Sequence, residues 1–162
     1  MAEEAGRANL EKIDHIVVLM LENRSFDHML GYLSLEGGRC DVDGLRGGLA
    51  NEHQGGSYPV HHLGTTAIAE DPDHLASSVD LQLGGGKMDG FAASYAATLL
   101  SHGVEDADPG PIMGYYCGAD VPIYDHLASE FAVCDRWFSS VPGGDLAKPA
   151  LRAVRSRGRQ PR

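Results

Sequence analysis

Apolar positions in the first part of the chain predict a buried strand followed by a helix. Residues 13–21 are mostly apolar and rich in β-branched side chains, which is typical of a strand covered on both faces of a parallel sheet. Polar residues follow at once, and then Phe26, Leu30 and Leu33 recur at helical spacing. The predicted unit places the turn at 22–25 at the carboxyl end of the strand, where open α/β sheets bind ligands.

The remaining pattern predicts short elements separated by loops. Clustered glycines indicate long, shaped loops between residues 34 and 90, with short helices near 72–82 and 90–101. Helical spacing of apolar residues returns within 123–138, and a further strand is expected to begin at Val133. The fold class expected from this order is α/β, with helices and long Gly-rich loops around a parallel sheet.

Composition fits one globular domain. The chain has 162 residues, of which 43% are apolar, enough to build a packed core. No apolar run approaches the roughly 20 residues of a transmembrane helix, and the acidic start before Ile13 does not resemble a secretory signal. Three widely spaced cysteines fit reduced thiols better than a disulfide framework. We therefore expect a cytoplasmic protein without a transmembrane segment, and the sequence leaves its oligomeric state open.

Charge is distributed unevenly along the chain. From Lys148 onward there are 6 of the 13 basic residues and no acidic residue, so residues 1–147 carry the other 7 basic and all 23 acidic residues. Such an acidic body argues against a nucleic-acid partner and against adhesion to anionic membranes. The basic tail needs its own explanation, and a nucleic-acid-binding arm is one candidate.

Glu22 and Asn23 are the first candidates for a ligand site. At a strand end, their side chains offer two hard oxygen ligands to a divalent cation, and the Asn23 amide can instead donate to a phosphoryl oxygen. The same segment also suits a helix start, with Asn23 or Ser25 as the N-cap and Asp27 in the first turn. The residues alone leave both interpretations open.

Other polar residues have structural explanations. Asp135 and Arg136 suit a structural ion pair at least as well as a ligand site, and Met88 and Phe91 suit the core. His61 and His62 are adjacent, so on a strand they would face opposite ways and could not share one metal ion.

Residues 14–28 resemble the opening signature of the bacterial phosphoesterase family that includes phospholipases C and acid phosphatase. Further blocks agree with that family in order: Asp71-Pro72-Asp73-His74, Gly86-Lys87-Met88-Asp89-Gly90-Phe91, and the stretch from Met113-Gly114-Tyr115-Tyr116 through Cys134-Asp135-Arg136-Trp137-Phe138 to Gly143. The resemblance covers about residues 12–144, the first third or so of a typical member.

The resemblance implies an alkaline-phosphatase-like α/β fold and metal-assisted hydrolysis of a phosphate ester or phospholipid. It implies that Glu22 is a metal ligand, that Asn23 lies at the metal and phosphate site, and that His74 protonates the leaving oxygen. The cofactor is then a divalent metal ion of unspecified identity. Taken alone, His74 is also explained as a capping or solvated loop histidine. A non-catalytic α/β binding or structural module is the alternative function.

After residue 143 the chain departs from the family pattern. Members usually continue with Thr-x-Pro-Asn-Arg, whose Thr (or Ser) is the nucleophile, whereas residues 144–149 read Gly-Asp-Leu-Ala-Lys-Pro. The residues from 145 can be encoded by the codons GAC CTG GCC AAA CCG GC, chosen among synonymous codons. Read one base later, these become ACC TGG CCA AAC CGG, or Thr-Trp-Pro-Asn-Arg. We therefore interpret 1–144 as the N-terminal part of a phosphoesterase domain and 145–162 as an out-of-frame, disordered tail. Resequencing codons 143–146 tests this interpretation.

If the frame is shifted, the consequences for the fold and the activity follow directly. The family's later metal ligands, an aspartate pair, and its later histidines would be missing. The parallel sheet would also be incomplete, with open edges. We therefore expect this chain to be truncated and inactive as written.

Overall fold

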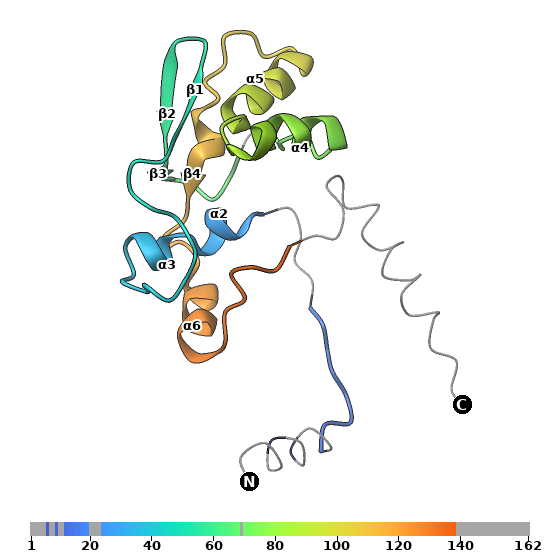
Figure 1. Ribbon diagram of the computed structural model, residues 1–162, viewed down its shortest axis with the longest axis vertical. Helices are drawn as coiled ribbons and strands as arrows, with labels where there is room; N and C mark the ends of the chain where they lie inside the picture. The colour runs from blue at the N-terminus through green and yellow to red at the C-terminus, as the bar shows by residue number, and fades with distance from the viewer. Residues whose placement is uncertain (1–5, 7–8, 10–11, 20–23, 69, 139–162) are drawn as a thin grey trace, which may run out of the picture.

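The structure is a computed structural model that describes residues 6, 9, 12–19, 24–68 and 70–138. Within these residues no helix is both long and apolar enough to cross a membrane. The described chain consists of short helices and two small sheets without a closed barrel (Figure 1). The mixed α/β class predicted from the sequence is confirmed.

The elements of the described chain form two groups in space, with a pair of short strands between them (Figure 1). The helices are α2 (Phe26–Leu30), α3 (Tyr32–Leu35), α4 (Ala76–Leu83), α5 (Phe91–Ser101) and α6 (Pro122–Glu130), with 3-10 turns η1 (Gly84–Gly86) and η2 (Gly110–Met113). The strands are β1 (Ala50–His53), β2 (Gly56–Pro59), β3 (His61–His62) and β4 (Gly114–Tyr115). Figure 1 shows the β1–β2 hairpin with α4 and α5 at one end, α2, α3 and α6 at the other, and β3 and β4 between them.

The two sheets differ in direction. Strands β1 and β2 form an antiparallel hairpin in which Asn51 lies opposite Tyr58. Strands β3 and β4 are parallel, with His62 opposite Tyr115. The only parallel pairing among the described residues is therefore two residues long on each side.

Sequence patterns located the helices better than the strands. Helices α4, α5 and α6 lie where they were predicted, and α2 begins at Phe26 as expected. Residues 13–19 form no strand, and Ile16 and Val17 are 82% and 90% exposed. A β-branched run becomes a strand only when neighbours pair with its backbone and cover its side chains, and no described strand pairs with this run.

One further strand assignment was wrong, and one hairpin was not predicted. Residues 131–138 contain a turn but no strand, so the strand expected at Val133 does not form. The β1–β2 hairpin lies in a region that the sequence predicted to be mostly loop. Its turn contains Gly55 at a φ of +81°, a backbone conformation that glycine adopts without strain.

The buried core lies between α3, α6 and β4. Its members are apolar side chains with little exposed surface: Tyr32, Leu33, Val42, Leu45, Tyr115 and Ala128. The half-buried side chains of Phe26 and Leu30, on α2, pack against this cluster. The helical spacing seen in the sequence therefore does point the α2 apolar face inward.

Asn51 joins the hairpin to the start of α5. Its side chain is only 3% exposed, and Oδ1 accepts hydrogen bonds from the backbone N–H groups of Phe91 (2.7 Å) and Ala92 (3.2 Å). Its Nδ2 donates to the Met88 carbonyl at 3.3 Å. Because the preceding residue Gly90 provides no side-chain cap, Asn51 satisfies N–H groups that α5 cannot satisfy internally.

Met88, which lies beside this cap, does not have the core position predicted for it. Met88 was expected in the core, but it is 50% exposed, and its contribution to the cap is its backbone carbonyl. A Cβ on Gly90 would lie 1.8 Å from the Leu81 carbonyl oxygen, so only glycine allows α4 and α5 to approach this closely.

Replacing Asn51 should destabilise the fold strongly. Asn51→Ala leaves the N–H groups of Phe91 and Ala92 and the Met88 carbonyl without this partner, and we expect the free energy of unfolding to fall by about 2–4 kcal/mol in urea denaturation. Glu52→Ala, on the exposed face of the same strand, should change it by less than about 0.5 kcal/mol. Equal, small effects of the two substitutions would contradict the capping role.

Candidate functional site

The signature segment is described only from Arg24 onward. Glu22 and Asn23 lie outside the described residues, so their roles as metal and phosphate ligands stay predictions. Ser25 is the N-cap of α2, and its Oγ accepts a hydrogen bond from the His28 backbone N–H at 3.1 Å. Asp27 lies in the first turn of α2. The capping interpretation is therefore confirmed for Ser25, two residues after Asn23.

His28, the last residue of the signature, is buried against β4. Its side chain is 8% exposed, and its ring meets the edge of Tyr116 with centroids 4.4 Å apart. The His28 carbonyl accepts from the Tyr116 backbone N–H at 2.9 Å. Nε2 is buried without a hydrogen-bond partner among the described residues. Burial, aided by the nearby positive charge of Arg24, lowers the pKa of His28 to about 4.

His74 lies in the loop that leads into α4. Its neighbour Asp73 fixes this loop, because Asp73 Oδ1 accepts from the Leu75 backbone N–H (2.9 Å) and Oδ2 accepts from the Ser78 hydroxyl (2.6 Å). These hydrogen bonds lower the pKa of Asp73. The His74 side chain is half-buried, and its ring makes no hydrogen bond to another described residue. Because Glu22 and Asn23 are not described, the catalytic role of His74 stays a prediction.

Two surface depressions accompany these elements. One, of about 490 Å³, is bordered by residues of α3 and of the loop 40–47. The other, of about 310 Å³, lies between Asp73 and the facing sides of α4 and α5. His74 borders neither of these two depressions.

A second group of polar side chains gathers beside β3 and β4. His62 Nε2 lies 2.7 Å from Asp120 Oδ2, and one ligand atom from each of His62, Cys117 and Asp120 lies within 4.8 Å of the others. The Cys117 backbone N–H also donates to Asp120 Oδ2 at 2.8 Å. This hydrogen bond, followed by that from His62, lowers the pKa of Asp120 to about 2.

The two adjacent histidines diverge as the strand pattern predicted. His61 Nδ1 lies 3.1 Å from the Pro59 carbonyl oxygen, whereas His62 reaches Asp120. Sequence reasoning missed the group of His62, Cys117 and Asp120 because it considered the histidine pair alone. The parallel register of β3 and β4 brings the three side chains together. No local sequence motif predicts that register.

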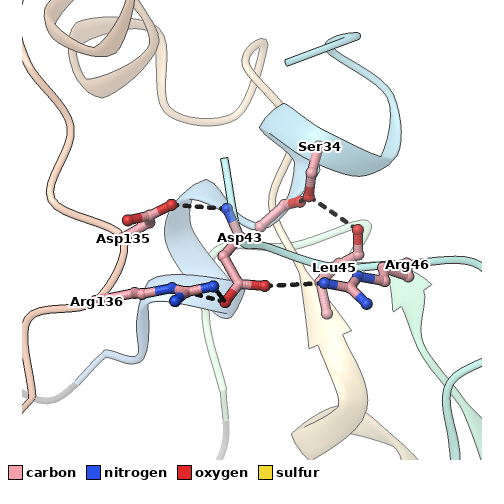
Figure 2. Close-up of polar contacts among 7 residues, drawn as sticks. Ser34, Asp43, Leu45, Arg46, Asp135 and Arg136 are labelled. Atoms are coloured by element: carbon pink, nitrogen blue, oxygen red, sulfur yellow. Dashed lines mark hydrogen bonds and ion pairs between the residues drawn. The ribbon is translucent and has the colours of Figure 1, made fainter. Parts of the chain in front are cut away.

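The block around Asp135 and Arg136 is tied to the loop that follows α3. Figure 2 shows Asp43 at its centre. The Asp43 backbone N–H donates to Asp135 Oδ2 at 2.7 Å, and its carboxylate pairs with Arg136 at 3.0 Å and with Arg46 at 3.1 Å. The predicted ion pair forms for Arg136, with Asp43 as its partner, whereas Asp135 accepts a backbone hydrogen bond and forms no ion pair among the described residues. These exposed contacts hold residues 131–138 against the rest of the chain.

Comparison with known proteins gives one consistent result. A profile of the phosphoesterase family matches residues 13–148. Non-specific phospholipase C1 of Arabidopsis thaliana is 34% identical over 141 residues, which are 80% of this chain and 25% of that protein. Phospholipase C A of Mycobacterium tuberculosis is 32% identical over 158 residues, or 85% of this chain and 28% of that protein. The chain thus spans a quarter to under a third of the length of these relatives.

Burial of His28 should make stability depend on pH. In the folded protein His28 binds a proton only below about pH 4, whereas in the unfolded chain it does so below about pH 6.5. The free energy of unfolding therefore falls as the pH drops from 6.5 towards 4. Between pH 7 and pH 5 the loss from this residue is about 2 kcal/mol. His28→Phe, which keeps an aromatic ring beside Tyr116, should lose correspondingly less stability in urea unfolding over this range.

The matched control is His126, which is exposed on α6. His126→Phe should keep the full acid sensitivity of the original chain. Identical losses of stability in the original chain and in His28→Phe would show that His28 does not carry this dependence.

Proposed function

The chain belongs to the phosphoesterase family, and on that premise we propose that the protein hydrolyses phosphoric ester bonds with the help of a divalent metal ion. The observation that carries the proposal is the match over residues 13–148, which contains the signature and the later blocks in the family's order. Relatives named as phospholipases C, from a plant and from a bacterium, support a phospholipid as the substrate class over a phosphomonoester.

The proposed site is built around Glu22 and Asn23. Their carboxylate and amide oxygens are hard donors that suit a divalent cation. When bound, the metal ion would supply positive charge to stabilise the phosphoryl group during hydrolysis. Ser25 supports the arrangement by fixing the start of α2 directly after these residues. His74 is proposed to donate a proton to the leaving oxygen.

The proposed nucleophile is a hydroxyl group that this sequence lacks at the family position, since residues 144–149 contain neither Ser nor Thr. We propose that the gene is shifted by one base near codon 144, and that the chain as written is inactive. The missing hydroxyl also supports the second candidate, a non-catalytic α/β module. Cooperative unfolding of the 162-residue chain without hydrolysis would favour that candidate, whereas an aggregating product would favour truncation.

Loss of the proposed metal ligand should abolish activity in a frame-restored, full-length protein. Hydrolysis of p-nitrophenyl phosphorylcholine is expected to fall at least about 100-fold in Glu22→Ala, because the charge that stabilises the phosphoryl group is lost with the metal. Glu52→Ala, an exposed carboxylate on β1, serves as the control and should retain the original rate. Unchanged turnover in Glu22→Ala would refute the metal-binding role.

The role of His74 predicts a dependence on the leaving group. An acid matters most when the departing oxygen is strongly basic, so His74→Asn should slow hydrolysis of a phospholipid by about 100-fold or more. The same variant should slow release of p-nitrophenol, a stable leaving group, by much less. His126→Asn is the control for replacing an exposed histidine. Equal losses on both substrates would indicate that His74 positions the loop and is not the acid.

A further inference from the structure

The group of His62, Cys117 and Asp120 has no role in the proposed hydrolysis. It lies beside β3 and β4, and its three residues are neither in the signature nor in the Asp71–His74 block, although Cys117 and Asp120 fall within the family stretch 113–143. They combine an imidazole, a thiol and a carboxylate, which are the three kinds of side chain that bind zinc in proteins. From their arrangement we propose that these residues form a binding site for Zn²⁺ or a cation of similar chemistry.

Two of the ligands come from one tight turn. The Asp120 backbone N–H donates to the Cys117 carbonyl at 3.0 Å, and the Cys117 N–H donates back to Asp120 Oδ2 at 2.8 Å. These hydrogen bonds hold the thiol and the carboxylate on the same side of the turn, three positions apart. Structural zinc sites use the same spacing when two cysteines bind from a short turn.

The third ligand comes from a different part of the chain and is fixed by the sheet. His62 lies on β3 opposite Tyr115, and the Leu63 backbone N–H donates to the Tyr115 carbonyl at 2.9 Å. The His62 ring lies 6.1 Å from the Tyr115 ring, centroid to centroid. The backbone on both sides of the site is therefore held before any ion binds, which reduces the entropy that binding must overcome.

The separations fit a tetrahedral ion after small movements. Zinc lies about 2.0–2.3 Å from nitrogen, oxygen and sulfur ligands, so ligand atoms around it are about 3.3–3.8 Å apart. Here the ligand atoms lie within 4.8 Å of one another, and His62 Nε2 and Asp120 Oδ2 are 2.7 Å apart. Small side-chain movements that separate His62 Nε2 from Asp120 Oδ2 would place the three atoms around one ion, and a water molecule would complete its four-coordinate shell.

The donor set also predicts which ions bind. A thiolate and an imidazole favour Zn²⁺ and Co²⁺ over Mg²⁺ and Ca²⁺, which prefer all-oxygen ligands. The side chains of His62 and Asp120 are 45% and 24% exposed, so an ion can enter from solvent. The site is thereby distinguished chemically from the oxygen ligands proposed at Glu22 and Asn23.

Cobalt absorbance tests the proposal on the 162-residue chain as it stands. Co²⁺ is added to the reduced protein, and the thiolate-to-cobalt charge-transfer band is followed in the near ultraviolet, with displacement by Zn²⁺ giving the zinc affinity. We expect a saturable band with one ion per chain, displaced by Zn²⁺ and unaffected by Mg²⁺. A Cys40→Ser/Cys134→Ser double variant, which leaves Cys117 as the only thiol, should keep the band.

Matched substitutions decide whether the three residues act together. Cys117→Ser should abolish the band, and His62→Gln should weaken Co²⁺ binding by more than the ~10–100-fold that loss of an outer-shell partner costs. His61→Gln, the adjacent histidine that contacts Pro59, should bind as the original chain does. Glu22→Ala should also keep the band, so failure of the hydrolysis proposal leaves this result unchanged.

Three outcomes would overturn the proposal, and the first concerns the original chain. Absence of the band in the folded original protein, checked by circular dichroism, would overturn the proposal and leave the three residues as a hydrogen-bonded group only. A band that survives Cys117→Ser, or that is lost equally in His61→Gln, would overturn it as well.

Discussion

The parallel pairing of β3 with β4 is the constraint on which the rest of the described structure depends. It brings residues 61–63 beside residues 114–115, although more than fifty residues of chain separate them. The contact is close because Gly114 has no side chain, and a Cβ there would lie 2.2 Å from the Leu63 side chain. A larger residue at 114 would force Leu63 away and open the strand pair.

Tyr115 at the end of β4 and the two residues that follow it each make a different long-range contact. Tyr115 enters the core between α3 and α6, and its hydroxyl donates to the Glu36 carboxylate. Tyr116 donates its backbone N–H to the His28 carbonyl, and its hydroxyl donates to the Thr66 carbonyl at 3.0 Å. Cys117 begins the turn that meets His62. The signature helix α2 and the proposed zinc site are therefore attached to β4 and the residues directly after it.

How far the sequence predicts this structure depends on the range of the interactions involved. Helices α4, α5 and α6 were predictable because their apolar spacing and their boundaries are local. The Ser25 cap was predictable for the same reason. The β3–β4 register and the Asn51 cap of α5 were not, because each is created by residues distant in sequence. The run 13–21 shows the converse, since a strand pattern without described partners leaves Ile16 and Val17 exposed. Family resemblance identified Glu22, Asn23 and His74, and their roles stay predictions.

Amide hydrogen exchange at two positions tests this account most directly. The Leu63 N–H donates to the Tyr115 carbonyl, and the Tyr116 N–H donates to the His28 carbonyl, both at 2.9 Å. If the strand pair organises the fold, both amides should exchange slowly and with equal protection. Their free energy of opening should equal that of global unfolding, as for buried amides of α5 such as Thr98. Rapid exchange at Leu63 and Tyr116 while Thr98 stays protected would show that α5 and its surroundings fold without the strand pair, and would contradict the account.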